Sequence, residues 1–264
     1  MSEVKHEVLL QAKGIYKNFE TSKKDQAVHA LTNVDLTLYR GETLALVGES
    51  GCGKSTLGRT LIRMLPATRG SVTFEGQNIT AMKDKEFAPL RRRMQMVFQD
   101  PYASLDPRMK VRDIIAEPLE TYHVCKTKAE TTHRVLELMQ AVGVPAEFLN
   151  RYPHQFSGGQ RQRLTIARAL VPHPQVLILD DSSSALDFAT DAALRKALKE
   201  QTHGMTVFIV SQRASAVQRA DRILVLDDGN LVGSGTHANL LKTCDVYREI
   251  CLSQLSREEV EKTL

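Results

Sequence analysis

The chain has 264 residues, a length that suits one large domain or two small ones. Its hydrophobic content of 42% and charged content of 25% are those of an ordinary globular protein, and its net charge of +4 gives little support for a nucleic-acid partner or an anionic membrane surface. No run approaches about 18 apolar residues and the N-terminus lacks an apolar core, so we expect neither a membrane-spanning helix nor a signal peptide.

The first quarter of the chain contains strand-like and helical segments. Apolar and polar residues alternate at residues 8–17 and 31–38, which predicts two strands joined through a polar, lysine-rich turn at residues 21–26. The short apolar run at residues 44–47 predicts a buried strand. A helix is expected from Lys54 to about Met64, and a further strand at residues 71–74.

A glycine-rich segment separates the buried strand from this helix. Its sequence, GESGCGKS, fits the pattern GxxxxGK[ST] of phosphate-binding loops in full. Glycine lets backbone N–H groups turn toward phosphate oxygens, and the helix N-terminus adds partial positive charge. We expect Lys54 to reach the β- and γ-phosphates of ATP, and Ser55 to ligate Mg²⁺. The predicted nucleotide-binding residues of this segment are Gly48, Glu49, Ser50, Gly51, Cys52, Gly53, Lys54, Ser55 and Thr56.

The four cysteines are Cys52, Cys125, Cys244 and Cys251. They show no CxxC spacing and form no Cys/His group typical of a metal site, which predicts reduced thiols in a cytosolic protein. Because Cys52 lies inside the glycine-rich segment, a bulky thiol reagent is expected to block nucleotide binding there.

The middle of the chain differs in character from both ends. After a strand-like segment at residues 94–97, strand signals are few and helical signals dominate. The predicted helices cover residues 111–120, 126–141 and 160–170. We therefore interpret the chain as a single domain of residues 1–264, in which a helical subdomain at 99–170 is inserted into a core of residues 1–98 and 171–264.

A second candidate site begins where the apolar run at residues 176–179 ends. Asp180 follows this run, and in phosphate-loop enzymes an aspartate at a strand end holds Mg²⁺, directly or through water. The remaining predicted elements are a helix at 190–200, strands at 206–210, 222–226 and 230–235, and a helical tail from Ala238. Strands that alternate with helices indicate an α/β fold with a mostly parallel sheet.

The sequence FSGGQRQ at residues 156–162 resembles the LSGGQ signature of ABC ATPases, with phenylalanine in the first place. Alone, it also suits a simple helix start capped by Ser157. Together with the phosphate loop and the acidic strand end, it makes essentially the whole chain resemble an ABC-type ATP-binding subunit. This resemblance implies a P-loop NTPase (RecA-like) core, an N-terminal antiparallel β subdomain and an inserted α-helical subdomain. The implied phosphate contacts are Ser157, Gly158, Gly159 and Gln160.

The resemblance also implies roles for residues outside these motifs. Phe19 resembles the aromatic residue that stacks on adenine. Gln99 resembles the Q-loop glutamine, which senses the γ-phosphate, joins Ser55 and Asp180 at the metal and couples to the membrane partner. Residues 184–187, with the sequence SALD, resemble the D-loop.

In this family, two ATP-binding subunits pack head to tail, so that the signature of one subunit completes the nucleotide site of the other. Dimer closure around ATP, and opening after hydrolysis, drives the attached membrane subunits. The resemblance thus implies a peripheral position on the cytoplasmic face of the membrane. The implied partners are transmembrane permease subunits, a second ATP-binding subunit and, for an importer, a solute-binding protein, with no nucleic acid.

Two residues depart from the family pattern. Asp181 stands where most members have the glutamate that activates water, and a misplacement of about 1 Å can cost roughly 100-fold in rate. Gln212 stands where most members have a histidine that contacts the γ-phosphate, and glutamine cannot carry its charge. One interpretation is harmless drift with full activity. The other is the degenerate site of one subunit in a heterodimer, which binds ATP but hydrolyses it slowly, while its signature serves the active site.

The resemblance divides along the chain. Residues 8–180 are most similar to the ATPases of dipeptide, oligopeptide and nickel importers, especially at 99–108 and 152–157. Segments from residue 181 onward resemble exporter subunits, at 181–187, 211–213 and 244–250. We favour import of peptides or nickel. The alternatives are a subunit of a heterodimeric exporter, a non-transport ABC ATPase, or a structural role without catalysis.

Overall fold

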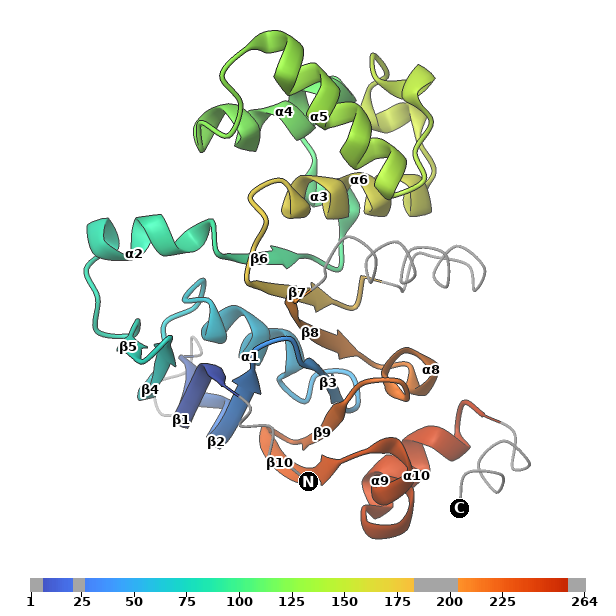
Figure 1. Cartoon of the computed structure of the whole chain (residues 1–264). Coiled ribbons are helices and arrows are strands. Elements are labelled where there is room, and N and C mark those ends of the chain that lie inside the picture. Colours follow the sequence, from blue (N-terminus) through green and yellow to red (C-terminus); the bar gives the residue numbers. More distant parts are fainter. Residues whose placement is uncertain (1–6, 21–26, 183–203, 256–264) are drawn as a thin grey trace, which may run out of the picture. The chain divides into compact units, whose positions relative to one another are not determined.

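The computed structural model describes residues 7–20, 27–182 and 204–255, and these residues form two compact units (Figure 1). Unit 1 comprises Met1–Ala88 and Thr206–Leu264, and unit 2 comprises Pro89–Met205. The predicted turn at residues 21–26, the D-loop at 184–187 and the helix at 190–200 lie outside the described residues. Unit 2 takes in strands on either side of the helical segment, and the limits 99–170 of the inserted subdomain stay a prediction.

Unit 1 contains an antiparallel sheet with the strand order β2-β1-β4-β5. Its strands are β1 (Val8–Glu20), β2 (Ala27–Tyr39), β4 (Arg69–Phe74) and β5 (Gln77–Asn78). The predicted strands at 8–17 and 31–38 are confirmed, and both extend further along the same antiparallel pairing. Their apolar residues alternate into the interior, as Leu36 and Leu38 do on β2.

A second group of strands in unit 1 has the order β10-β9-β3-β8. They are β3 (Thr43–Val47), β8 (Thr206–Ser211), β9 (Arg222–Asp227) and β10 (Asn230–Gly235). β3 pairs in parallel with both β8 and β9, whereas β10 returns antiparallel to β9. Leu44, Ala45, Leu46 and Val47 of β3 are all buried, as expected for a central strand covered on both faces.

Short helices accompany these strands in unit 1. They are α1 (Lys54–Leu61), α8 (Ala214–Val217), α9 (His237–Thr243) and α10 (Asp245–Leu252). One buried cluster joins Ala45 and Val47 of β3 to β9, α8, α9 and α10, with Tyr247 completely buried within it. α2 (Asp84–Arg91) crosses the boundary at which the chain passes from unit 1 to unit 2.

Unit 2 combines two parallel strands with a group of helices (Figure 1). The strands are β6 (Met94–Val97) and β7 (Val176–Asp180), and the helices are α3 (Pro101–Ser104), α4 (Val111–Thr121), α5 (Lys128–Ala141) and α6 (Gly158–Leu170). Two 3₁₀ turns, Ala146–Phe148 and Pro153–Gln155, lie between α5 and α6. Helices α4, α5 and α6 contact one another, and α6 also contacts β6.

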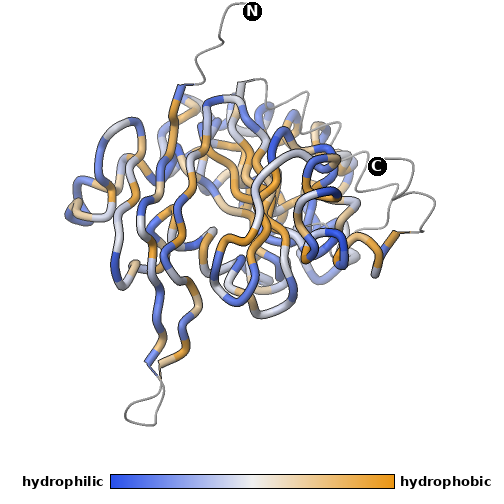
Figure 2. Tube along the Cα trace, turned by 90° about the horizontal axis from the view of Figure 1, so that it is seen from below, coloured by the Kyte–Doolittle hydropathy of each residue, from blue (hydrophilic) through white to orange (hydrophobic). Residues whose placement is uncertain are grey.

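Hydrophobic residues follow the inner strands, whereas hydrophilic residues follow the outer turns (Figure 2). Among the described residues, no helix has the length and apolar character needed to cross a bilayer. The α/β fold with a mostly parallel core, an antiparallel β region and a helical segment is confirmed. Four short elements, α2, β5, α3 and α8, were not predicted, because segments of two to eight residues carry too little periodicity to detect.

The helices predicted at 111–120, 126–141 and 160–170 are found within two residues of their limits, and larger differences occur at two places. α1 ends at Leu61, about one turn before Met64, because Ile62 already leaves the helical conformation. The helical tail predicted from Ala238 is two helices, since Cys244 between α9 and α10 has an extended backbone with φ −129° and ψ 107°.

Candidate nucleotide-binding site

The glycine-rich segment at 48–55 leaves β3 and turns directly into α1, as the sequence predicts. Gly53 stands at the N-cap of α1 with φ 103°, and a Cβ added there would lie 2.2 Å from the carbonyl oxygen of Ala30. A Cβ added at Gly48 would lie 2.1 Å from the carbonyl oxygen of Leu226. The loop is thus packed so closely against neighbouring backbone that only glycine fits at either position.

Lys54 is 7% exposed and folds back over its own loop. Its Nζ donates hydrogen bonds to the carbonyl oxygens of Gly48, at 2.9 Å, and of Glu49. The same Nζ lies 3.7 Å from the sulfur of Cys52. A buried ammonium group requires such partners. The loop therefore concentrates a positive charge beside the first turn of α1, where backbone N–H groups also favour an anion.

Cys52 connects the loop to the rest of unit 1 through its backbone. Its carbonyl oxygen accepts a hydrogen bond of 3.1 Å from Gly229, whose own carbonyl accepts one of 2.9 Å from Thr32. The turn between β9 and β10 therefore ties the loop to β2. Burial raises the pKa of the Cys52 thiol, while the nearby Lys54 ammonium opposes this shift.

Strand register brings Gln212 to the edge at which the loop begins. Val47 of β3 pairs with Ser211 of β8, so Gly48 and Gln212 each follow a paired residue on neighbouring parallel strands. Val47 also pairs with Val225 of β9, which places Leu226 at the same edge. The carboxyl ends of three strands thus meet where open α/β sheets place ligands. The Gln212 side chain is partly buried.

Phe19, the predicted adenine-stacking residue, lies near the outer end of β1. It is 39% exposed and pairs across the sheet with Val28. Two residues beyond Val28, Ala30 packs against Gly53 of the loop, so the strand pair that carries Phe19 borders the loop. The Lys17 ammonium lies 5.0 Å from the centre of the Phe19 ring, a distance that permits a cation–π contact.

A corresponding edge in unit 2 carries Asp180, Asp181 and Gln99. Val97 of β6 pairs with Leu179 of β7, so the residues that follow lie side by side. Asp180 is fully buried. Asp181 has φ 43°, in the left-handed region that aspartate tolerates better than most residues. The Gln99 side-chain amide donates a hydrogen bond of 3.4 Å to Oδ2 of Asp181.

The signature-like segment forms the N-terminus of α6. Ser157 is its N-cap: its hydroxyl accepts a hydrogen bond of 3.3 Å from the backbone of Gln160, and the Gln160 side chain accepts one of 3.0 Å from the backbone of Ser157. This reciprocal pair is a capping box. The predicted helix start is therefore present, and it presents the first-turn amides at an exposed Ser157.

Three contacts between α6 and the segment after β6 were not predicted from the sequence. Gln162 donates to the carbonyl of Phe98 at 3.4 Å, and Arg168 donates to that of Ser104 at 2.7 Å. The guanidinium of Arg161 lies 3.8 Å from the centre of the Tyr102 ring. The only sequence signal for them is arginine and glutamine repeating along a helix, which more often indicates a solvated face.

Each unit supplies residues with the chemistry that a Mg²⁺–nucleotide requires. The hydroxyl of Ser55 and the side-chain oxygens of Gln99 and Asp180 are the donors that Mg²⁺ prefers, and the loop combines glycine backbone with a lysine. Unit 1 assembles Phe19, the loop and Gln212, whereas unit 2 assembles Gln99, Asp180, Asp181 and the signature-like segment. The roles of the individual residues remain predictions.

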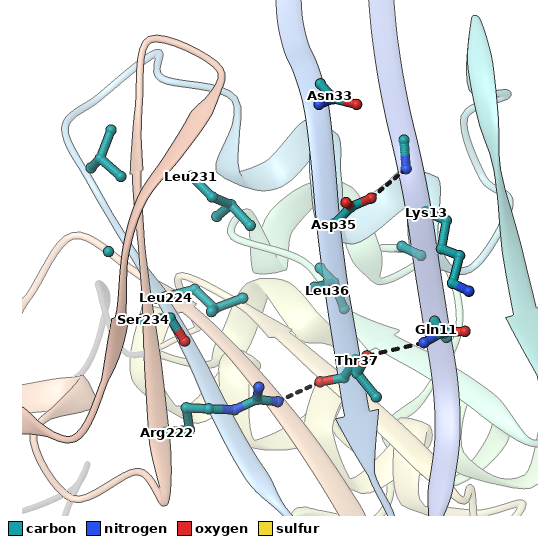
Figure 3. A pocket seen from close by; sticks show the side chains of 14 residues that line it. Gln11, Lys13, Asn33, Asp35, Leu36, Thr37, Arg222, Leu224, Leu231 and Ser234 are labelled. Carbon is teal, nitrogen blue, oxygen red and sulfur yellow. Dashed lines mark hydrogen bonds between the residues drawn. The ribbon is translucent and has the colours of Figure 1, made fainter.

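An open groove of about 820 Å³ in unit 1 is separate from these residues (Figure 3). It lies between β1 and β2 on one side and the β9–β10 hairpin on the other. Its polar groups bond to one another: Gln11 donates to Thr37 at 3.3 Å, Asp35 accepts from Gly14 at 2.5 Å, and Arg222 donates to the Thr37 carbonyl. No residue of the predicted nucleotide site lines this groove.

The fold and the loop define a phosphate-loop nucleotide-binding protein. Residues 31–184 match the family model described as ABC transporter. The chain is 47% identical over 230 residues to the oligopeptide transport ATP-binding protein OppF of Bacillus subtilis, covering 86% of this chain and 75% of that protein. It is 44% identical over 218 residues to the glutathione import ATP-binding protein GsiA of Pectobacterium atrosepticum, covering 81% of this chain and 35% of that protein.

Among solved structures, a dimeric post-hydrolysis state of an ATP-binding cassette bound to ADP and Pi is similar. Its TM-score is 0.81 at 29% identity, and the match covers 86% of this chain and 98% of that one. The chain belongs to the ABC transporter family, within the group of peptide-importer ATP-binding subunits. It is accordingly an ABC-type ATPase and the ATP-binding subunit of a transporter.

Proposed function

We propose that this subunit drives the import of oligopeptides. The observation that carries the proposal is the 47% identity to an oligopeptide transport ATP-binding protein. Because that match covers 86% of the chain, it includes more than half of the residues from Asp181 onward. The exporter-like segments in that region therefore do not mark an end of the importer similarity. The alternative within the importers is that this subunit drives the import of nickel.

The proposed partners follow from the same relationship. The chain attaches to two permease subunits at the cytoplasmic face of the membrane, pairs with a second ATP-binding subunit and receives its solute from a binding protein. We propose that the second subunit is a different chain, because a site with altered catalytic residues needs a partner with intact ones. Purification through a tag on this chain should recover permeases and a second ATPase. Recovery of ribosomes or DNA instead would contradict the proposal.

A transport measurement separates the possible solutes. Cells that lack this chain should lose uptake of labelled oligopeptides, and a plasmid copy should restore it. A Lys54→Ala copy is the control, because it removes the charge of the phosphate loop and is expected to restore nothing. Restored nickel uptake without peptide uptake would assign the subunit to nickel, and efflux of peptide would assign it to export.

We propose the following division of roles within the nucleotide site. Phe19 stacks on adenine, and the loop residues from Gly48 to Thr56 hold the phosphates with Lys54 at their centre. Ser55, Gln99 and Asp180 hold Mg²⁺, which when bound neutralises phosphate charge. The signature residues Ser157, Gly158, Gly159 and Gln160 contact the nucleotide held by the partner subunit.

We further propose that this subunit's own site hydrolyses ATP slowly. The resemblance to the family assigns both substituted residues to the γ-phosphate. Within unit 2 Asp181 accepts a hydrogen bond from Gln99, and within unit 1 Gln212 lies at the edge where the loop begins, as this assignment requires of each residue. Asp181→Glu restores the missing methylene, although glutamate adopts the positive φ of this position less readily than aspartate. Gln212→His restores a side chain that can be charged.

The test is the double variant Asp181→Glu with Gln212→His in the assembled transporter. It should raise hydrolysis at this site by at least about tenfold, within the range that positioned acid–base groups provide. The matched control adds Lys54→Ala, which should abolish the gain if it arises at this loop. A double variant that folds, binds ATP and gains no hydrolysis would show that the two substitutions are harmless drift.

A further inference from the structure

The loop that carries Gln212 is held by a side chain from the far end of the chain. This loop joins β8 to α8 and comprises Gln212 and Arg213. The side-chain amide of Gln254 donates a hydrogen bond of 2.8 Å to the carbonyl of Gln212. The side-chain oxygen of Gln254 accepts a hydrogen bond of 2.9 Å from the backbone N–H of Ala214.

This double contact matches the chemistry of a carboxamide. One side chain satisfies a carbonyl and an N–H that flank Arg213, as a neighbouring strand would satisfy two backbone groups. Glutamate of the same size supplies the acceptor but no donor at neutral pH, and alanine supplies neither. The contact therefore depends on the amide and not on side-chain volume.

Gln254 is itself held in place by α10. Tyr247, Ile250 and Cys251 of this helix are buried in the cluster that covers β3 and β9. The backbone N–H of Gln254 donates to the carbonyl of Cys251 at 3.1 Å, and that of Leu255 does so at 2.8 Å. A helix with one buried face thus fixes the point from which the Gln254 side chain reaches the loop.

We propose that Gln254 is a positioning residue that sets the backbone of the loop carrying Gln212, and thereby the contact of Gln212 with the γ-phosphate. The inference rests on the role proposed above for Gln212. Gln254 is exposed, and its contribution lies in the two backbone hydrogen bonds. Because only ATP has a γ-phosphate, the expected signature is a loss of preference for ATP over ADP.

The experiment measures the affinities of the full chain for ATP and for ADP in four variants. Gln254→Ala and Gln254→Glu should each weaken ATP binding by about threefold to tenfold, the worth of one or two net hydrogen bonds, and leave ADP binding unchanged. Gln212→Ala should do the same. Glu249→Ala, which removes an exposed side chain from α10, the helix that ends two residues before Gln254, is the matched control and should change neither affinity.

The double variant Gln254→Ala with Gln212→Ala decides whether the two residues act together. If Gln254 acts through Gln212, the double variant loses no more than Gln212→Ala alone, because the effects of coupled residues do not add. Hydrogen exchange at the Ala214 amide should also quicken in Gln254→Ala, since this N–H loses its acceptor.

The outcomes separate this inference from the proposed function. If Gln212→Ala changes the ATP preference while Gln254→Ala does not, or if the two effects add, the positioning role is wrong and the role of Gln212 stands. Unchanged exchange at Ala214, or full tolerance of Gln254→Glu, also contradicts the positioning role. If Gln212→Ala leaves the ATP preference intact, the proposed role of Gln212 is wrong and the inference falls with it.

Discussion

The phosphate loop of unit 1 and the acidic strand end of unit 2 are built in different ways. In the loop, neighbouring backbone leaves no space for a side chain at Gly48 or Gly53, and Lys54 is buried against loop carbonyls. At the strand end, an exposed Gln99 reaches Asp181 through one hydrogen bond of 3.4 Å. Close packing against neighbouring backbone fixes the shape of the phosphate loop, whereas the geometry of the acidic strand end depends on the length of individual side chains.

This difference explains how binding and hydrolysis can diverge in one subunit. At the phosphate loop and at the acidic strand end alike, functional residues follow the last paired residues of neighbouring parallel strands. A change of one methylene at residue 181 leaves the strands and the loop intact, yet it changes the reach of a carboxylate. We therefore expect ATP binding to tolerate few substitutions in the loop, and turnover to respond to side chains at the edges.

The largest expected effect comes from filling the loop glycines. Gly53→Ala combines a positive φ with a Cβ 2.2 Å from the Ala30 carbonyl, and should abolish ATP binding. The strain and the overpacking together should lower the free energy of unfolding by on the order of 4 kcal/mol. Urea unfolding and nucleotide titration measure the two effects.

Two further glycines separate the causes. In Gly48→Ala the added Cβ would lie 2.1 Å from the Leu226 carbonyl oxygen. The free energy of unfolding should fall by roughly 2–3 kcal/mol, and this decrease measures the steric clash alone. Gly51 has φ 85°, and a Cβ added there would lie in open space. The free energy of unfolding of Gly51→Ala should fall by roughly 1–2 kcal/mol, and this decrease measures backbone strain alone. Equal losses in all three variants would contradict the close packing of the loop.

Alkylation of Cys52 should weaken ATP binding while the protein stays folded. Cys52 is 8% exposed and burial raises the pKa of its thiol, so the thiolate fraction at neutral pH is small. The rate of alkylation should therefore rise with pH beyond the ordinary thiol value of about 8.5, and bound ATP should slow it. The modified protein should bind ATP at least about tenfold more weakly, because the adduct occupies the loop.

The control for this experiment is Cys52→Ala, treated with the same reagent. It should retain ATP binding after treatment, although the other three cysteines react where they are accessible. Undiminished ATP binding by wild-type protein that is fully alkylated at Cys52 would show that this side of the loop lies away from the nucleotide.

Substitution of Arg161, in the first turn of α6, is expected to have a smaller effect that is confined to the stability of the fold. Arg161 donates to the carbonyls of Pro153, at 2.6 Å, and His154, at 3.3 Å, and its guanidinium stacks on Tyr102. Arg161→Ala should therefore lower the free energy of unfolding by about 2–3 kcal/mol. Tyr102→Ala removes only the exposed stacking partner and should cost about 0.5–1 kcal/mol.

Nucleotide titration of the isolated chain sharpens this prediction. ATP affinity should remain unchanged in Arg161→Ala, since the contacts of Arg161 are with Pro153, His154 and Tyr102, none of which is proposed to bind the nucleotide. A loss of ATP affinity that matches the loss of stability would show that these contacts also support nucleotide binding.

Much of the fold could be predicted because it depends on local patterns. Buried apolar runs gave β3 and β7, and the order of glycine, lysine and serine after β3 gave the loop and the start of α1. The serine and glutamine of the signature-like segment sit three residues apart, which is the spacing of the capping box that the structure contains.

The sequence by itself therefore determined the family, the phosphate loop and the identity of the residues at the strand ends. Only the tertiary structure decided which of these residues meet, and what holds them. Gln254 contacts the Gln212 carbonyl from 42 positions away, and Gln99 contacts Asp181 from 82 positions away. Such contacts leave no local pattern, because strand register and helix packing set them after the chain has folded.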